Sequence, residues 1–363
     1  MDTDQVLAFR LARSGLAARC ARGLAEAAAC PASDFARDAA LLALAARAED
    51  VSGEAYRRAV DDGDLLVAHI VRGAIHALAP GDLALYGRAL IARDDADLGA
   101  QLGRQVQRLA AEKGFAPTEA LEEVAAATGE ALAGGRALDK NALHAELRQR
   151  VRADLMPWCR SCGSHHVAPM LWRYATVQAG AVLDAERRYR RGRPGRTPAA
   201  REAVRRFLHF YGPATTGDFA DWAGLAKPHA RRLWDAAAGE LAETRVGRTP
   251  AWLLRDDEGE LASPPDATGI RLLPPGDPYL QKPNRPLLAR DPELRKRLFR
   301  PVASPGVVLR DGRLAGLWRA RAKGRKAEIT VEKLGRLARA DLEEEAHGVA
   351  RVRGAADMVL LIG

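Results

Sequence analysis

The stretch Tyr211–Gly247 reads YGPATTGDFADWAGLAKPHARRLWDAAAGELAETRVG and predicts a helix-turn-helix followed by a β-hairpin. Thr215 or Thr216 can cap a short first helix, and Gly224 then turns the chain. A second helix is expected over Lys227–Ala238, followed by two strand candidates on either side of a Gly-Arg-Thr-Pro turn. This order of elements predicts a winged helix.

The second helix of this stretch carries basic side chains on its first turns, where a recognition helix enters the major groove of DNA. Leu233, Ala236 and Ala237 are expected to face the core. A helical hairpin that serves only protein packing is the alternative, because winged helices also have that use. The side chains predicted to contact DNA here are Lys227, His229, Arg231, Arg232 and, at the hairpin tip, Arg248.

The composition is that of a multi-domain globular protein with a positive charge. A chain of 363 residues suggests two to four domains, and 47% hydrophobic residues are enough to form their cores. The 56 Lys and Arg residues exceed the 47 Asp and Glu residues, which gives a net charge of +9. A positive net charge attracts polyanions, and nucleic acid is the obvious polyanion. A GC-rich genome is a second source of the arginine, alanine and glycine content.

The chain lacks the sequence marks of a membrane or secreted protein. No apolar run approaches the roughly 20 residues that span a bilayer. The first residues, MDTDQVLAFRLARSG, begin acidic and predict an amphipathic helix instead of a signal peptide. Four cysteines do not make a disulfide framework in a chain of this length. We therefore expect a cytoplasmic monomer that joins the nucleoid when it binds DNA.

Periodicity divides the chain into tandem modules that each combine helices with a strand pair. The run Leu65–Leu78 is apolar, is interrupted by Arg72-Gly73 and favours a β-hairpin. A helix from Pro117, a helix capped by Asp139 and strand-like pieces over 158–183 repeat this outline. The predicted fold is α+β, mainly helical, with winged helices over 1–95, 96–190 and 191–262 and a β-barrel-like domain over 263–363.

An arginine-rich stretch, RRYRRGRPGRTPAAREAVRR, separates the second module from the third. It holds nine arginines against one glutamate between Arg187 and Arg206. Phosphates relieve the repulsion within so dense a run, which predicts contact with a DNA backbone; a solvated linker is the alternative. The residues predicted to bind DNA are Arg190, Arg191, Arg193 and Arg196.

The C-terminal region alternates as strands do. Strand candidates over 306–309, 314–322 and 328–331 surround Asp311-Gly312, a hairpin signal. A helix over 341–352 and a strand over 358–362 complete the domain. The predicted loop carries five basic residues and no acidic one: Arg319, Arg321, Lys323, Arg325 and Lys326.

One cluster has the residue types of a zinc site, namely Cys159-x-x-Cys162 followed by His165 and His166. Both histidines follow Cys162 within four residues, a spacing that makes a tetrahedral arrangement of all four difficult. Contact with DNA or simple packing is the alternative, and the main prediction contains no metal. The sequence has no phosphate-binding glycine loop and no zinc-protease helix, so we expect no nucleotide or other cofactor.

The order of several motifs resembles a bacterial tandem winged-helix family that includes the AlkZ-like DNA glycosylases. The motifs are Arg72-Gly73-Ala74-Ile75-His76, the basic helix of the third module, Asp277-Pro278-Tyr279-Leu280, and Asp311-Gly312-x-x-x-Gly316-x-Trp318. The resemblance implies a C-shaped clamp of three winged helices and a barrel around duplex DNA. It also implies excision of bulky alkylated purines, including crosslinks, without metal or cofactor, in DNA repair or genotoxin self-resistance. Arg72 and His76 are then expected to contact DNA. For His76, a position buried beneath the hairpin is the alternative.

The chain departs from this family at the catalytic motif. Members carry Gln-x-Gln or Gln-x-Asp before the helix that is expected here near Arg37, whereas this chain has Pro31-Ala32-Ser33-Asp34-Phe35. One alignment places Ser33 and Phe35 at the pair, and a shift by one residue places Ala32 and Asp34 there. A carboxylate stabilises an oxocarbenium-like sugar, so Asp34, with Ser33 as a ligand for water, is the catalytic candidate. Asp34 is equally suited to cap the next helix.

Two functions from different classes follow. The first is a monofunctional glycosylase that acts on damaged double-stranded DNA. The second is a non-catalytic DNA-binding protein or transcription regulator that lacks the excising residues. Regulators usually pair half-sites as symmetric dimers, and the sequence shows no evident dimerisation helix.

Overall fold

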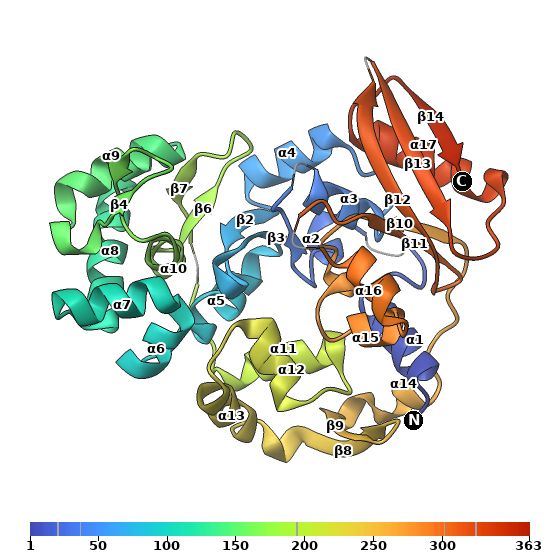
Figure 1. Cartoon of the computed structure of the whole chain (residues 1–363), viewed down its shortest axis with the longest axis horizontal. Helices are drawn as coiled ribbons and strands as arrows, with labels where there is room; N and C mark the ends of the chain where they lie inside the picture. Colours follow the sequence, from blue (N-terminus) through green and yellow to red (C-terminus); the bar gives the residue numbers. More distant parts are fainter. Residues whose placement is uncertain (20–21, 37, 194, 301, 324) are drawn as a thin grey trace. The chain divides into compact units, whose positions relative to one another are not determined.

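The computed structural model describes residues 1–19, 22–36, 38–193, 195–300, 302–323 and 325–363 (Figure 1). The chain forms two compact units. The first unit comprises Met1–Ala59, Arg205–Asp218 and Ala238–Gly363, and the second comprises Val60–Val204 and Phe219–Ala237. Helices and strands mix in both units, as the α+β prediction requires, whereas the four expected domains stay a prediction.

The second unit is built on four strands that run β3-β2-β6-β7. The predicted hairpin of Leu65–Leu78 is confirmed, because β2 (Leu66–His69) and β3 (Ile75–Leu78) pair antiparallel from Leu66 with Leu78 to His69 with Ile75. A second hairpin consists of β6 (Ala181–Leu183) and β7 (Tyr189–Arg191), and β6 joins β2 through Val67 and Leu183. Two hairpins more than a hundred residues apart therefore share one sheet.

Helices cover this sheet and form the rest of the second unit (teal to green in Figure 1). Asp139 caps its helix as predicted, since its carboxylate accepts from the backbone N–H groups of Asn141 and Ala142. The expectation of strand-like pieces over 158–183 is wrong for its centre, where the helix α10 (Pro169–Ala179) packs between α8 (Pro117–Ala131) and the sheet. The helices and the small hairpin are α5 (Leu83–Tyr86), α6 (Asp95–Leu102), α7 (Arg104–Lys113), α8 (Pro117–Ala131), α9 (Lys140–Arg150), β4 (Trp158–Cys159), β5 (Ser164–His165) and α10 (Pro169–Ala179).

The helix-turn-helix and the hairpin predicted from Tyr211–Gly247 are both present along the chain. After α11 (Arg201–Tyr211), the first helix α12 (Thr216–Ala223) begins one residue after Thr215, whose hydroxyl accepts from the backbone N–H of Asp218. Gly224 has a φ of 71°, the left-handed conformation that suits glycine, and α13 (Lys227–Asp235) follows. Then β8 (Leu241–Val246) and β9 (Thr249–Leu254) pair antiparallel. The buried residues of α13 are His229, Ala230 and Trp234. Of the three residues expected in the core, Ala237 is buried and Leu233 is half-buried, whereas Ala236 is exposed.

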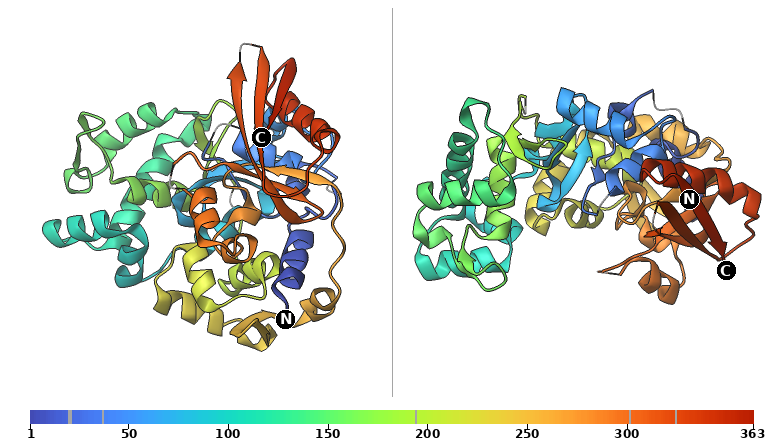
Figure 2. Two further views of the ribbon diagram at one scale, coloured as in Figure 1. Left: turned by 45° about the vertical axis from the view of Figure 1, so that its right-hand side comes forward. Right: turned by 90° about the horizontal axis from the view of Figure 1, so that it is seen from above.

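The C-terminal part of the first unit is a five-stranded sheet in the order β10-β11-β12-β13-β14 (orange to red in Figures 1 and 2). The predicted strands and helix are confirmed. The barrel-like closure is not, because within the described residues β10 and β14 are the free edges of an open sheet. Helix α17 packs on β10, β13 and β14 and connects β13 to the parallel strand β14. The bounds are β10 (Ile270–Leu273), β11 (Gly306–Arg310), β12 (Arg313–Lys323), β13 (Lys326–Lys333), α17 (Arg339–Val352) and β14 (Asp357–Ile362).

Part of the rest of the first unit packs against this sheet. Its core joins Leu11 and Leu16, at the end of α1, to Leu273 and Val307 of the sheet and to Tyr279. Among the described residues, no helix is both long and apolar enough to cross a membrane. The remaining elements are α1 (Thr3–Arg13), α2 (Leu24–Ala27), β1 (Ala32–Ser33), α3 (Ala39–Ala45), α4 (Gly53–Asp62), α14 (Glu258–Ala262), α15 (Arg285–Leu288) and α16 (Pro292–Leu298).

Candidate nucleic-acid interface

The catalytic candidates Ser33 and Asp34 lie at the end of the short strand β1. Ser33 is half-buried, Asp34 is 9% exposed, and Phe35 beside them is 89% exposed. Helix α3 begins at Ala39, and the residue at its N-cap position is Asp38. Arg37, the expected start of that helix, lies outside the described residues. The segment therefore holds a largely buried carboxylate next to an exposed phenyl ring.

A buried ion pair fixes the surroundings of this segment. Arg47, just after α3, meets both carboxylate oxygens of Asp277 at 2.8 and 2.9 Å. The Asp277 carboxylate also accepts from the backbone N–H of Tyr279 at 2.8 Å. Gly276, with a φ of 85°, lies so close to Ser33 that an added Cβ would be 3.7 Å from the Ser33 Cβ and Oγ. The ion pair thus joins the helix after Asp34 to the turn that packs on Ser33.

A second buried contact holds the residues before β1. The Sγ of Cys30 lies 3.6 Å from the hydroxyl of Tyr211, and that hydroxyl donates to the carbonyl of Pro278 at 2.9 Å. Burial raises the pKa of the Cys30 thiol to about 12, so it stays neutral. Cys30 is therefore an inert packing residue that ties the start of β1 to the turn containing Asp277.

Helix α13 presents only part of its expected basic surface. Lys227, Arg231 and Arg232 are exposed, whereas the imidazole of His229 is buried and its Nδ1 lies 3.5 Å from Asp97. Arg232 also pairs with Asp97, and it lies 3.6 Å from Asp94. This arrangement favours a packing role for His229, because an acidic partner on α6 holds it inward.

Two further predicted contacts, Arg72 and His76, belong to the β2–β3 hairpin. Arg72 is half-buried with a φ of 58°, and its stem packs over Gly224, the turn glycine between α12 and α13. His76 is 7% exposed, and its Nδ1 lies 3.0 Å from the carbonyl oxygen of Ala74. Burial lowers the pKa of His76 to about 4, so the ring is neutral near pH 7. His76 is satisfied beneath the hairpin, which was one of its two expected positions.

The arginine-rich stretch contains three exposed cations of the second unit. Arg190 is half-buried and donates to the carbonyl of Val60 at 3.0 Å. Arg191, Arg193 and Arg196 are exposed, and their side chains make no hydrogen bond or ion pair within the described part of the chain. These three guanidinium groups are available to phosphates without the loss of an internal partner.

The basic hairpin β12–β13 of the first unit is partly neutralised by acidic neighbours. Arg321 pairs with Glu328 at 2.5 Å, and Lys326 pairs with Asp357 at 2.6 Å. Arg319 donates to the carbonyl of Ala303 at 2.9 Å, while Arg325 is exposed. The side chain of Lys323 lies outside the described residues. Arg248, at the tip of the β8–β9 hairpin, is also exposed.

The structure brings three of the four possible zinc ligands together. The ligand atoms of Cys159, Cys162 and His166 lie within 4.8 Å of one another. His165 lies apart from them, with its Nδ1 2.9 Å from the carbonyl oxygen of Met156. Hydrogen bonds from Ser161, His166 and Cys162 lower the pKa of the Cys159 thiol to about 6.

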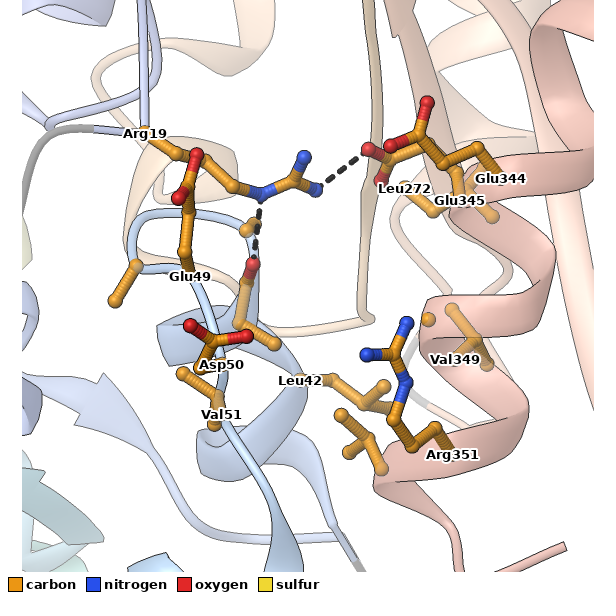
Figure 3. Close-up of a pocket in the computed structure, with 15 residues that line it drawn as sticks. Arg19, Leu42, Glu49, Asp50, Val51, Leu272, Glu344, Glu345, Val349 and Arg351 are labelled. Atoms are coloured by element: carbon orange, nitrogen blue, oxygen red, sulfur yellow. Dashed lines mark hydrogen bonds and ion pairs between the residues drawn. The ribbon is translucent and has the colours of Figure 1, made fainter.

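A cavity of about 340 Å³ lies between the end of α3 and α17 in the first unit (Figure 3). Arg19 crosses its mouth and holds Glu345 at 2.6 Å and the carbonyl of Ala45 at 3.0 Å. Among the described residues, no aromatic side chain and neither Ser33 nor Asp34 lines it. Four acidic side chains face two arginines there, which does not suit a DNA phosphate or a stacked base: Glu49, Asp50, Glu344, Glu345, Arg19 and Arg351.

Comparison with known proteins places these features in a family context. A family model described as DNA glycosylase AlkZ-like matches residues 31–352. An interstrand DNA cross-link repair glycosylase of Streptomyces sahachiroi is 34% identical over 170 residues, which is 43% of this chain and 43% of that protein. The alignment therefore spans less than half of that relative. The solved structure of the Streptomyces sahachiroi DNA glycosylase AlkZ matches over 100% of both chains with a TM-score of 0.78 and 24% identity, a likeness of fold.

Proposed function

The chain belongs to the AlkZ-like DNA glycosylase family, and we propose on that premise that it is a monofunctional DNA glycosylase that excises alkylated purines from duplex DNA. The observation that carries the proposal is the position of Asp34. The family match begins at residue 31, within the segment where members have their catalytic pair, and Asp34 is the carboxylate of that segment. The repair of interstrand crosslinks, the activity named for the Streptomyces sahachiroi relative, is the substrate class that we extend to this chain.

The chemistry of an alkylated purine fits a site with one carboxylate. An N7- or N3-alkylpurine carries a positive charge, so the base leaves neutral when the N-glycosidic bond breaks. The electron pair of that bond stays on the base, and the positive charge passes to the sugar as an oxocarbenium-like ion. A carboxylate near C1′ stabilises this ion, and water adds to C1′ and releases its proton to complete hydrolysis. The product is an abasic site.

In this scheme Asp34 stabilises the charged sugar and the hydroxyl of Ser33 holds the attacking water. The support for these roles is their surroundings. The Arg47–Asp277 ion pair holds the chain just after α3, and Gly276 lies so near Ser33 that an added Cβ would touch it, so both limit the movement of the segment. A catalytic group on a rigid support needs less reorganisation at the moment of reaction.

Phe35 is the proposed contact to the bases. A side chain that is 89% exposed gains little from packing, and aromatic rings stack on bases regardless of sequence. Because Phe35 follows Asp34 directly, a base stacked on its ring would lie near the Asp34 carboxylate. The exposed arginines at 191, 193 and 196, with Lys227, Arg231, Arg248 and Arg325, are the proposed contacts to the phosphates.

The proposal is tested by the release of base from a duplex that contains N7-methylguanine, with heat or alkali cleavage of the abasic product as the readout. We expect release by the wild type and a loss of at least about a hundredfold in rate for Asp34→Asn, the scale for removal of one electrostatic group. Asp38→Asn is the matched control. It makes the same chemical change four residues away, and asparagine tolerates the φ of 62° at that position.

Binding to the same duplex is measured in parallel, because it separates the two proposed functions. Tight binding without base release from N7-alkyl, N3-alkyl or crosslinked duplexes would leave a non-catalytic DNA-binding protein. Equal rates for Asp34→Asn and the wild type would remove Asp34 from the mechanism. A loss of release in Asp38→Asn as well would show that the change acts through the fold of the segment.

A further inference from the structure

A short β-hairpin in the second unit carries two cysteines on one tight turn. Strands β4 and β5 pair Trp158 with His165 and Cys159 with Ser164. Gly163 has a φ of 59°, which lets the chain turn back immediately after Cys162. The sequence Cys-x-x-Cys-Gly therefore closes on itself, and both thiols are free. Such a turn places two sulfur atoms on the same side of the hairpin.

His166 completes a three-ligand group with these cysteines. The Sγ atoms of Cys159 and Cys162 and a ring nitrogen of His166 all lie within 4.8 Å of one another. Zinc bonds of about 2.3 Å to sulfur and 2.0 to 2.1 Å to nitrogen place tetrahedral ligand atoms about 3.4 to 3.8 Å apart. The ligand atoms have to approach by about an ångström to reach this spacing, which side-chain torsions can supply because Cys162 is exposed and Cys159 and His166 are only half-buried.

The imidazole of His166 is held in the orientation that a metal ligand needs. Its Nδ1 lies 2.8 Å from the carbonyl oxygen of Val167 and donates a hydrogen bond to it. The lone pair is then on Nε2. Ligating histidines usually donate their other ring nitrogen to a carbonyl or a carboxylate in this way. His165 is oriented differently, since its Nδ1 contacts the carbonyl of Met156 and its ring packs edge-on to Trp158.

We propose that Cys159, Cys162 and His166 bind a zinc ion whose fourth ligand is a water molecule. Binding replaces the two thiol protons, which are released to solvent, so the ion is held by two thiolates and one neutral imidazole. The exposure of Cys162 leaves the fourth position open to solvent. The spacing argument against this motif assumed four protein ligands, whereas the structure needs only three and orients the two adjacent histidines differently.

The ion would act as a staple for the hairpin. Two strands of two residues each are too short to be stable by themselves. His166 lies three residues before the first residue of α10, so a metal bond would tie the hairpin turn to the start of that helix. Arg160 is exposed within the turn, and trypsin cleaves after arginine. The rate of cleavage after Arg160 therefore measures how often the turn opens.

The test is the metal content of full-length protein purified without chelators, measured by mass spectrometry. We expect about one zinc per chain in the wild type, at most about a tenth of that in Cys162→Ser and His166→Ala, and no loss in His165→Ala. Refilling the chelated wild type with Co²⁺ should produce thiolate-to-cobalt charge-transfer absorption. Chelation should also speed tryptic cleavage after Arg160 in the wild type and in His165→Ala.

Several results would overturn the proposal. The first is wild-type protein without zinc that shows no charge-transfer band on adding Co²⁺. The second is an equal loss of metal in His165→Ala and His166→Ala. The third is a purified reduced protein in which Cys159 and Cys162 form a disulfide in air with Zn²⁺ present, which would make the pair a redox site. Base release does not enter this test, so the proposal stands or fails independently of the glycosylase activity.

Discussion

Arg47 and Asp277 form a two-point ion pair inside the first unit, with both side chains at most 2% exposed. Arg47 also donates to the carbonyl groups of Ser14 and Ala43, so four of its five N–H groups have partners. Opposite charges and hydrogen bonds offset the cost of burying both ions, and the charge of Asp277 raises the pKa of Arg47. This pair lies next to the turn that packs on Ser33, so it supports both the fold and the candidate site.

Arg47→Met should strongly destabilise the protein, because it leaves the Asp277 carboxylate buried without a counter-ion. We expect a loss of about 3 to 5 kcal/mol in the free energy of unfolding, measured by urea denaturation at pH 7. Glu54→Ala, which breaks the exposed pair of Arg58 and Glu54, should change it by less than about 0.5 kcal/mol. Adding Asp277→Asn to Arg47→Met should recover part of the loss. Similar values for Arg47→Met and Glu54→Ala would contradict the importance of this ion pair.

Gly306 should not tolerate even a methyl group. A Cβ at that position would lie 2.5 Å from Cε2 of Trp318 and 2.6 Å from the carbonyl oxygen of Leu273. The Trp318 indole donates to that same carbonyl at 2.8 Å, so it cannot move away without losing the bond. We expect Gly306→Ala to lower the free energy of unfolding by about 1 to 3 kcal/mol.

Gly348, inside α17, is the control for this substitution because a Cβ there would meet nothing within 4 Å. Gly348→Ala should stabilise the protein by about 0.5 to 1 kcal/mol, since alanine favours a helix more than glycine does. Thermal unfolding of the two variants and the wild type measures both effects. The interpretation of Gly306 is contradicted if the two alanine variants unfold at the same temperature.

The buried histidine His76 should make stability depend on pH. Its pKa is lowered from 6.5 to about 4 in the folded protein, so protonation favours the unfolded chain. The neutral imidazole makes its full contribution to the free energy of unfolding above pH 6.5, and this contribution is lost as the pH falls toward 4. A loss of about 1 kcal/mol is expected between pH 7.5 and pH 5.5 from this residue. His76→Asn keeps a donor for the Ala74 carbonyl but does not titrate, so its stability should fall less over this range.

His347, exposed on α17, is the comparison for His76. His347→Asn makes the same substitution at an exposed position and is the control for the change itself. The free energy of unfolding of each variant is measured at several pH values between 5.5 and 7.5. A slope for His76→Asn equal to that of the wild type would show that folding does not lower the pKa of this imidazole.

Local patterns predicted the elements whose signals are contained in a few neighbouring residues. The hairpins at 66–78 and 241–254, the cap at Asp139 and the strands around Asp311-Gly312 follow from alternation and turn residues. Helix α10 was missed because its apolar positions suit a strand equally well. Pro169 at its first turn and Gly180 after its end were the signals that identify a helix.

Contacts between distant residues could not be predicted in this way. Asp97 faces His229 and Arg232 across more than 130 residues of sequence, and nothing local to α13 shows that an acidic group neutralises it. The same is true of Arg47 and Asp277, which are 230 residues apart. At the Cys159–Cys162 turn, residue spacing alone could not show that His166, and not His165, joins the two cysteines.

The exposed arginines at 193 and 196 should supply salt-dependent DNA affinity. Each phosphate contact adds about 0.9 to the slope of log K against log salt concentration, because binding releases condensed counterions. Arg193→Glu with Arg196→Glu should therefore weaken binding to an undamaged duplex and reduce that slope by about 1 to 2. Arg104→Glu with Arg108→Glu, on α7 of the same unit, makes the same change in net charge at exposed positions and is the control. Fluorescence anisotropy with a labelled duplex at several salt concentrations gives both slopes. Equal losses in the two double variants would mean that net charge alone drives binding, whereas a loss confined to the first assigns the phosphate contacts to the stretch that precedes α11.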